Sequence, residues 1–196
     1  MSDLTGLFDA LYSKLLLRDF FGKVVPGAVV ICALGFVVVG SAEVERFVQS
    51  AGFWPGLVIL GFAWLIGFAV QAFGEVTKLI GYHDYETGAL FYKRRKLFIE
   101  HTDAREHQQL ERLVVIKEAC GNGYVALLLG GVLVSLDFVV TSGLSSTVLL
   151  ASAHWHAIVF FVVLIAALAK MHRIQIKRQT EYMDAIHNLE DDQNSE

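Results

Sequence analysis

Proline, cysteine and charged residues are all scarce in this chain of 196 residues. It contains two prolines and two cysteines, and charged residues make up only 18% of it, whereas hydrophobic residues make up 55%. Cys32 lies inside an apolar run and Cys120 at the end of a polar interval, so we expect two reduced thiols and no disulfide. A composition this apolar excludes an ordinary soluble domain.

Familiar catalytic motifs are also absent from the sequence. The chain has no His-Glu-x-x-His metal motif, no phosphate-binding Gly-Lys-Ser/Thr loop and no Gly-x-Ser-x-Gly nucleophile elbow. Its longest polar interval, residues 75–120, carries eight basic and eight acidic residues, so it has no net charge with which to attract nucleic acid. We therefore expect no enzymatic activity, no cofactor, no metal site and no nucleic-acid partner.

What the sequence does have is a set of four apolar runs. They cover about residues 24–42, 54–74, 124–141 and 155–169. About 20 apolar residues in a helix are needed to cross the hydrocarbon core of a bilayer. We therefore predict an all-α polytopic membrane protein with four transmembrane helices, in which residues 1–196 form a single membrane domain.

The basic residues predict the orientation of these spans. Fifteen of the sixteen Lys and Arg lie in alternate intervals between the apolar runs, and only Arg46 lies in an interval assigned to the other side. Basic residues near membrane-spanning helices stay in the cytoplasm. The pattern predicts a membrane protein with both termini in the cytoplasm and with cytoplasmic segments 1–23, 75–120 and 170–196. Residues 41–53 and 142–154 are then predicted to be short outer loops. Trp54 and Trp155 fall at the outer boundary of the membrane, a level that amphipathic rings prefer.

Two helical features are predicted on the cytoplasmic side. Apolar residues at helical spacing between residues 4 and 15 predict an N-terminal amphipathic helix. Residues 75–120 are predicted to form a helical hairpin between spans 2 and 3. We expect this hairpin to end in a hinge at Gly121, Asn122 and Gly123, because two glycines around an asparagine permit left-handed backbone geometry.

The densest basic cluster consists of Lys93, Arg94, Arg95 and Lys96. Beside anionic lipid each of these charges gains about 1 kcal/mol. The cluster therefore predicts docking to lipid or to a protein partner, and a phosphate-bearing ligand is the other interpretation. The last helix is expected to continue past the fourth run to about Leu189, with an intermittent apolar face suited to packing on the hairpin, on another copy or on a soluble partner.

Two polar residues lie inside the predicted spans. A charge at the centre of a bilayer costs about 2.5–3.5 kcal/mol on insertion scales. Asp137 in span 3 is therefore either a carboxylate of an ion pathway or a residue near the interface that pairs with a histidine. Gln71, near the inner end of span 2, is expected to form a hydrogen bond between helices.

Small residues four apart occur in two of the spans. Ala63 and Gly67 form such a pair in span 2, and Ala126 and Gly130 form another in span 3. Pairs of this kind let helix backbones approach closely in a membrane. They predict either packing inside a four-helix bundle or a contact between subunits of a homo-oligomer.

The layout of the chain resembles a group of small uncharacterised bacterial inner-membrane proteins with four spans. The residues that carry this resemblance are Asp19-Phe20-Phe21 and Val25-Pro26-Gly27 at the entry to span 1, followed by two helical hairpins and a small cytoplasmic insert. Some four-span proteins of this size are membrane components of phage-defence systems. The resemblance concerns the layout and implies no particular site residue.

Two functions are consistent with these expectations. In the first, the chain is a non-enzymatic membrane component, or scaffold, that anchors or regulates a cytoplasmic partner, in a phage-defence or stress system. In the second, it forms an oligomeric gated pore or a membrane-disrupting effector. Spans with so little polar lining are unusual for a permanent aqueous path, which favours the first function.

Overall fold

The computed structural model describes residues 17–80, 104–142 and 155–193, and these form helices and no strand. The predicted amphipathic helix at residues 4–15 lies outside the described residues. So does the basic cluster formed by residues 93–96.

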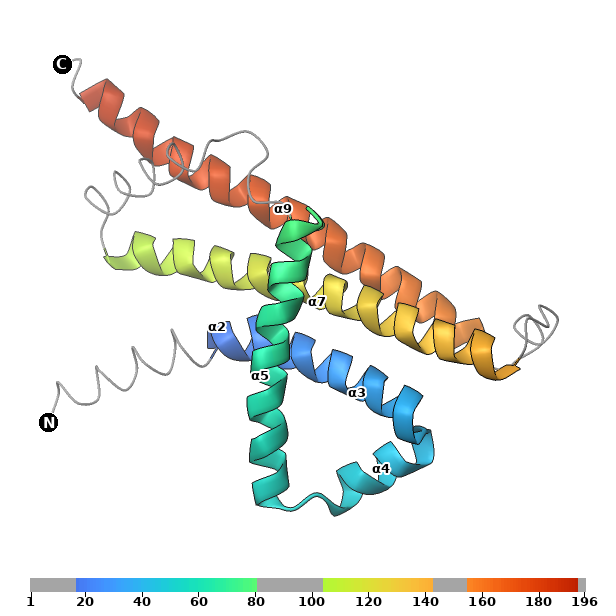
Figure 1. Cartoon of the computed structure of the whole chain (residues 1–196). Coiled ribbons are helices and arrows are strands. Elements are labelled where there is room, and N and C mark those ends of the chain that lie inside the picture. Colours follow the sequence, from blue (N-terminus) through green and yellow to red (C-terminus); the bar gives the residue numbers. More distant parts are fainter. Residues whose placement is uncertain (1–16, 81–103, 143–154, 194–196) are drawn as a thin grey trace, which may run out of the picture.

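Seven helical elements make up the described part of the chain (Figure 1). In chain order they are α2 (Leu17–Asp19), the π-helical segment η2 (Phe20–Val24), α3 (Val25–Val39), α4 (Ser41–Ser50), α5 (Phe53–Val76), α7 (Ala104–Ser142) and α9 (Trp155–Gln193). Four stretches within them are long and apolar enough to cross a membrane, as the sequence predicts. These stretches are Phe20–Val39, Phe53–Val76, Arg105–Asp137 and Ile158–Asp184.

The first span ends earlier than the sequence predicts. Gly40 has φ 87°, a left-handed conformation that favours glycine, and its N–H donates to the Phe36 carbonyl at 3.2 Å. The chain therefore leaves α3 after Val39 and starts α4, which occupies most of the interval that the sequence assigns to an outer loop. Figure 1 shows α4 as a bridge between the far ends of α3 and α5.

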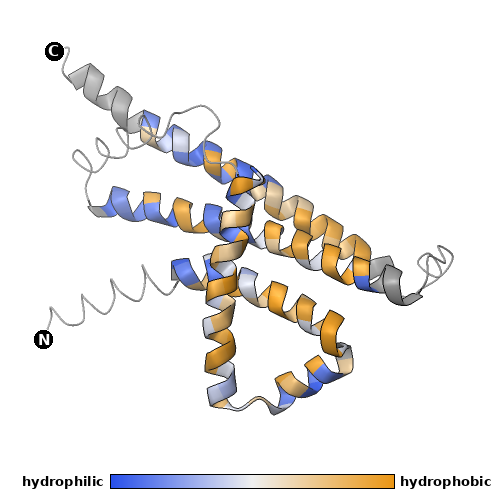
Figure 2. Cartoon of the chain, in the orientation of Figure 1, coloured by the Kyte–Doolittle hydropathy of each residue, from blue (hydrophilic) through white to orange (hydrophobic). Residues whose placement is uncertain are grey.

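The helices α7 and α9 are both longer than a single membrane crossing requires. Each has 39 residues, and at 1.5 Å per residue each is about 58 Å long. A hydrocarbon core of about 30 Å covers only half of that length. The expectation that the last helix continues past Lys170 is confirmed. Figure 2 shows that hydrophilic residues gather in the first half of α7 and in the second half of α9.

The hinge predicted at Gly121, Asn122 and Gly123 is wrong, because α7 passes through all three residues without a break. Neither glycine has a positive φ. Both Gly121 and Asn122 are buried, and they pack against other helices of the chain. The second arm of the predicted cytoplasmic hairpin is therefore the first half of α7, continuous with span 3.

The four spanning helices do not form a closed bundle. The main contacts among the described helices join α5 to α3, α3 to α7, and α7 to α9, so α5 and α9 are the outer members. The second half of α5 buries Ala63, Gly67, Val70 and Gly74. Its first half diverges from α3 in Figure 1 and exposes apolar side chains, among them Trp54 and Leu57.

Two apolar clusters hold the helices together. The larger one joins Val30 of α3, Val70 of α5 and Tyr124, Val125 and Ala126 of α7. The smaller one lies outside this core, where α7 and α9 continue side by side. We call that region, α7 residues 104–118 with α9 residues 171–184, the stalk.

The smaller cluster lies within the stalk and joins α7 to α9. It consists of Leu110 and Met183, with Tyr182 packed against them. The Tyr182 hydroxyl also donates to Gln109 Oε1 at 3.1 Å. Both apolar and polar contacts therefore keep the two halves of the stalk together.

Candidate functional site

The most unusual feature of the structure is a layer of buried polar side chains that occupies the part of the stalk next to the apolar core and extends one helical turn further, to Asn122. Its members come from α7 and α9 and are each no more than 9% exposed. They are Lys117, Glu118, Asn122, His172, Gln175 and Gln179. Buried polar groups need partners, because an unpaired one loses its hydrogen bonds to water without replacement. We call this layer the polar junction.

One half of the polar junction joins α7 to the start of span 1. Glu118 and Asn122 are four residues apart on α7 and so share the face that meets η2. Asn122 donates from Nδ2 to the Gly22 carbonyl of η2 at 2.6 Å. Arg18 donates from Nε and Nη2 to the two carboxylate oxygens of Glu118, at 2.9 and 2.7 Å. This two-pronged geometry is the strongest form of an Arg–carboxylate pair.

The other half of the junction joins α7 to α9. Lys117 donates from Nζ to Gln179 Oε1 at 2.9 Å. The carbonyl of Lys117 lies 2.9 Å from His172 Nδ1, and since a carbonyl only accepts, Nδ1 carries the proton. A Cβ at position 121 would lie 2.8 Å from the His172 ring, so Gly121 lets that ring pack directly on α7. The glycine therefore serves close approach between helices.

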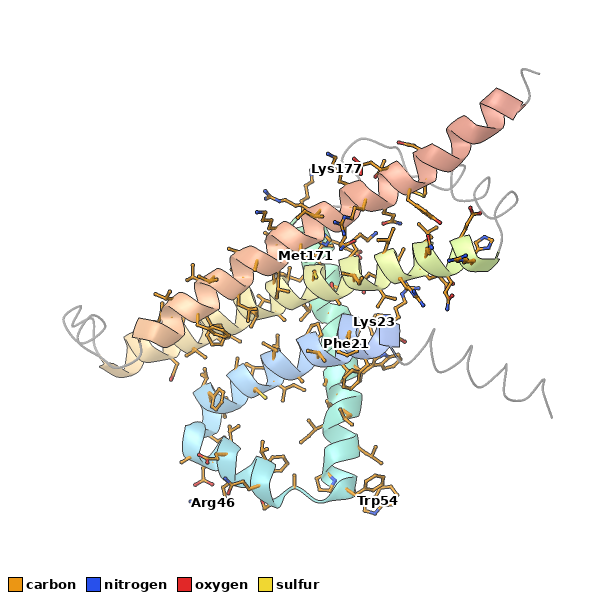
Figure 3. All side chains as sticks on the ribbon, turned by 180° about the vertical axis from the view of Figure 1, so that it is seen from behind. Phe21, Lys23, Arg46, Trp54, Met171 and Lys177 are labelled. Carbon is orange, nitrogen blue, oxygen red and sulfur yellow. The ribbon has the colours of Figure 1, made fainter. Side chains whose placement is uncertain are left out.

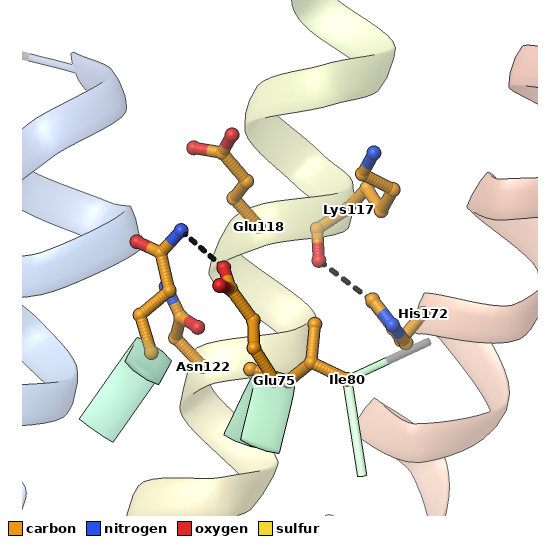
Figure 4. Close-up of a pocket in the computed structure, with 7 residues that line it drawn as sticks. Glu75, Ile80, Lys117, Glu118, Asn122 and His172 are labelled. Atoms are coloured by element: carbon orange, nitrogen blue, oxygen red, sulfur yellow. Dashed lines mark hydrogen bonds between the residues drawn. The ribbon is translucent and has the colours of Figure 1, made fainter. Parts of the chain in front are cut away.

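A small pocket opens within the junction (Figure 4). It is lined by Gln71, Glu75, Ile80, Lys117, Glu118, Asn122 and His172. Two buried atoms of its lining, Gln71 Oε1 and His172 Nε2, have no hydrogen-bond partner among the described residues. Because Nδ1 of a neutral His172 holds the proton, Nε2 presents a lone pair. The pocket thus offers acceptors, and it suits a small hydrogen-bond donor of about the size of one water molecule.

The π-helical segment η2 is also fixed to α5. Lys23 donates from Nζ to Asp19 Oδ1 at 2.7 Å, and the same nitrogen lies 4.2 Å from the centre of the Phe68 ring. The backbone of Lys23 lies directly against Gly67 of α5, with no room for a Cβ there. Short π-helical segments occur often at functional sites. Here η2 contacts both α5 and α7.

The small-residue pairs of the sequence lie at contacts between helices of one chain. Ala63 and Ala126 are fully buried. Gly67 lies against the backbone of η2, and a Cβ at Gly130 would lie 3.3 Å from Ala33 of α3. The structure thus places these pairs within the chain, which corresponds to the first of the two interpretations.

The two intramembrane polar residues lie apart from each other. Gln71 lines the pocket, but its amide donates to Glu75 Oε1 at 2.9 Å within α5, whereas a bond between helices was expected. Asp137 is half-buried near the far end of α7. The 15 residues that separate it from Asn122 on this continuous helix correspond to about 22 Å. The structure therefore does not bring Asp137 into the polar junction.

Sequence reasoning missed most of the junction. Its α9 members lie at positions 172, 175 and 179, and Met183 continues the same helical face. The sequence therefore contains a polar stripe on one face of the helix. A search for apolar residues at helical spacing does not detect such a stripe. The partner stripe on α7 is Lys117, Gly121 and Tyr124, which also lie three or four residues apart and so share one helical face.

No family model, curated protein or solved structure matches the chain. In the described part of the chain, no group of three or more His, Cys, Asp or Glu is placed to hold a metal ion. The function is therefore argued from the junction and the stalk themselves.

Proposed function

We propose that the chain is a non-enzymatic membrane component that anchors or regulates a cytoplasmic partner through its stalk. The observation that carries this proposal is the continuity of α7 and α9, which leave the spans as uninterrupted helices and stay packed together. If these segments only connected or ended the spans, short loops would be sufficient and no pair of long helices would be needed. A rigid pair of helices offers a fixed surface to a second protein.

The surface of the stalk suits a soluble partner. Exposed charged residues lie on both of its helices. They include Arg105, Glu111, Arg112, Arg173, Lys177, Arg178 and Glu181. Of these, five are basic and two are acidic, so the surface complements a soluble protein whose docking face is mainly acidic.

The polar junction supports a regulatory role for the same surface. Glu118 and Asn122 connect α7 to the start of span 1, and His172 and Gln179 connect α7 to α9. Movement of either stalk helix would have to change these bonds. A partner bound to the stalk would thereby alter the packing of span 1, or be released by it.

The cytoplasmic location of the stalk belongs to the same proposal. It is supported by the basic residues, which gather at the stalk end of the spans and are nearly absent from the α4 end. The proposed site of the protein is the bacterial inner membrane. A place in phage defence rests on the resemblance in layout alone.

A pore or membrane-disrupting effector is the second candidate function. One observation favours it: α5 and α9 are the outer helices, and their outward faces carry many exposed apolar residues. Such faces could join copies of the chain side by side in the bilayer, as in a homo-oligomer. Asp137, on α7, is the carboxylate that the sequence suggests for such a path.

Affinity purification from the native host membrane tests the first candidate. The variant Arg112→Glu with Glu181→Arg exchanges two exposed stalk charges without changing the net charge. The variant Glu43→Arg with Arg46→Glu makes the same exchange on α4 and serves as the control. We expect one soluble protein to co-purify in a fixed ratio with the wild type and with the α4 variant, and to be lost from the stalk variant.

Two results would contradict the proposal. One is retention of the same soluble protein by both variants, which would place its binding site elsewhere. The other is a homo-oligomer of four or more copies that holds no soluble partner in any sample, which would favour the pore.

A further inference from the structure

The short helix α4 has one apolar face and one polar face. Val44, Phe47 and Val48 lie at i, i+3 and i+4 spacing and so share a side of the helix. The polar side carries the Glu43–Arg46 ion pair, with a contact of 2.7 Å. Gln49 donates to Glu45 Oε1 at 3.1 Å on the same side. An amphipathic helix of this kind needs an apolar surface to cover its apolar face.

The protein covers only part of that face. Val44 packs toward α3, where a Cβ at Gly35 would lie 3.0 Å from its methyl group. Phe47 and Val48 are 45% and 67% exposed. The aromatic residues that follow, Phe53 and Trp54, are exposed as well. Figure 3 shows Arg46 and Trp54 at the same end of the molecule, on the outside of the helices.

The position of α4 identifies what covers the rest. It connects the ends of two membrane spans, α3 and α5, on the side opposite the stalk. The segment η2 plus α3 has 20 residues, about 30 Å of helix, so α3 ends at the bilayer boundary. A helix joined directly to that end lies at the level of the headgroups. The acyl chains below it provide an apolar surface.

We propose that α4 is an interfacial helix, with Phe47 and Val48 inserted among the lipid acyl chains and its charged face in water. The helix lies in the plane of the membrane between spans 1 and 2. Its net charge is negative, since it has two glutamates and one arginine. Apolar burial therefore drives its contact with lipid, and attraction to anionic headgroups does not. In this position α4 keeps the outer ends of α3 and α5 apart.

Fluorescence quenching in lipid nanodiscs tests this placement. The full chain is used with its three native tryptophans replaced by phenylalanine. Single tryptophans are then introduced as Phe47→Trp and Val48→Trp, with Glu45→Trp and Gln49→Trp as matched controls on the polar face. The quenchers are phosphatidylcholine with brominated acyl chains and aqueous iodide.

We expect brominated lipid to quench the tryptophans at positions 47 and 48 severalfold more strongly than those at 45 and 49, and iodide to show the reverse order. Equal quenching of all four positions by iodide would overturn the proposal by placing the helix in water. Weak quenching of positions 47 and 48 by both reagents would also overturn it, because a second copy or a partner would then cover the face.

A second measurement leaves the native tryptophans in place. Nitroxide labels on Phe47→Cys and Gln49→Cys, in a chain with Cys32→Ala and Cys120→Ala, report their access to oxygen and to a water-soluble nickel complex. We expect position 47 to match Val134→Cys, a lipid-facing position of α7 that is 44% exposed. A nickel preference at position 47 equal to that at position 49 would contradict insertion.

Discussion

Asn122, at the stalk end of the spans, is 1% exposed, whereas Trp54, at the α4 end, is 74% exposed. An amide is thus fully buried at one end of the molecule, while the largest apolar side chain is in contact with the surroundings at the other. In a soluble protein the reverse distribution is usual, with large apolar side chains inside and amides at the surface. In a bilayer the observed distribution is expected, because the surrounding lipid solvates apolar side chains and offers no hydrogen-bond partner to polar ones.

The comparison shows where the specificity of helix packing lies in this chain. Apolar faces are interchangeable in lipid, so they do little to decide which helices meet. Polar groups near the membrane must find partners within the protein. The hydrogen bonds of Asn122 and His172 and the ion pair of Glu118 therefore select the neighbours of α7. Variants that act on one end and not on the other test this difference.

The largest effect is expected for Gly67→Leu. The position lies against the Lys23 backbone, which cannot move aside as a flexible side chain would. Overpacking usually costs about 1–3 kcal/mol, and a clash with backbone places this variant at the upper end or beyond. Thermal unfolding in detergent measures the loss. Gly61→Leu on the same helix, where a Cβ meets nothing within 4 Å, should leave the midpoint unchanged, and an equal loss in both variants would contradict the account.

A smaller loss is expected for Glu118→Gln. The change removes the negative charge that accepts both bonds from Arg18. Since Glu118 is largely buried but the Arg18 side chain is 47% exposed, we expect a loss of about 1–2 kcal/mol. A double-mutant cycle with Arg18→Gln measures the coupling between the two residues.

The matched control for this pair lies at the other end of the molecule. Glu43 and Arg46 form an ion pair of the same length on α4, but both side chains are more than half exposed. The same cycle with Glu43→Gln and Arg46→Gln should give a coupling below about 0.5 kcal/mol. Equal coupling at the two ends would remove the distinction between them.

A loss smaller than that of Glu118→Gln is expected for Asn122→Ala. It removes the bond from Nδ2 to the Gly22 carbonyl, and a neutral hydrogen bond contributes about 1 kcal/mol. Unfolding in detergent should show a loss of that size. Ser135→Ala changes an exposed residue of the same helix and should show none. An unchanged stability of Asn122→Ala would mean that η2 is held to α7 by apolar packing alone.

The sequence predicted the large-scale features of the fold because these depend on local composition. Apolar runs specify spanning helices wherever they occur, and the four spans needed no knowledge of contacts. The continuation of α9 past Lys170 was equally local, since no helix breaker follows that residue. Local composition therefore predicts which segments form helices, but it does not predict which helices pack against each other.

The remaining features depended on packing between distant segments. The glycines at 121 and 123 permit a turn, but the contact of Gly121 with the His172 ring favours a straight helix. Only the folded chain brings these two residues together. The helix α4 was overlooked for a different reason, because a ten-residue amphipathic pattern between two spans was read as a loop.

The polar junction joins the two stalk helices through Lys117, Gln179 and His172, and these bonds should hold the helices in one fixed arrangement. Pulsed electron paramagnetic resonance measures the distance between the two stalk helices directly. The nitroxide labels are attached at Arg112→Cys and Arg178→Cys, which are exposed positions on different stalk helices. The labelled chain also carries Cys32→Ala and Cys120→Ala and is studied in nanodiscs. We predict one narrow distance distribution, which broadens when His172→Ala and Gln179→Ala are added. A broad distribution in the chain with an intact junction would contradict the claim.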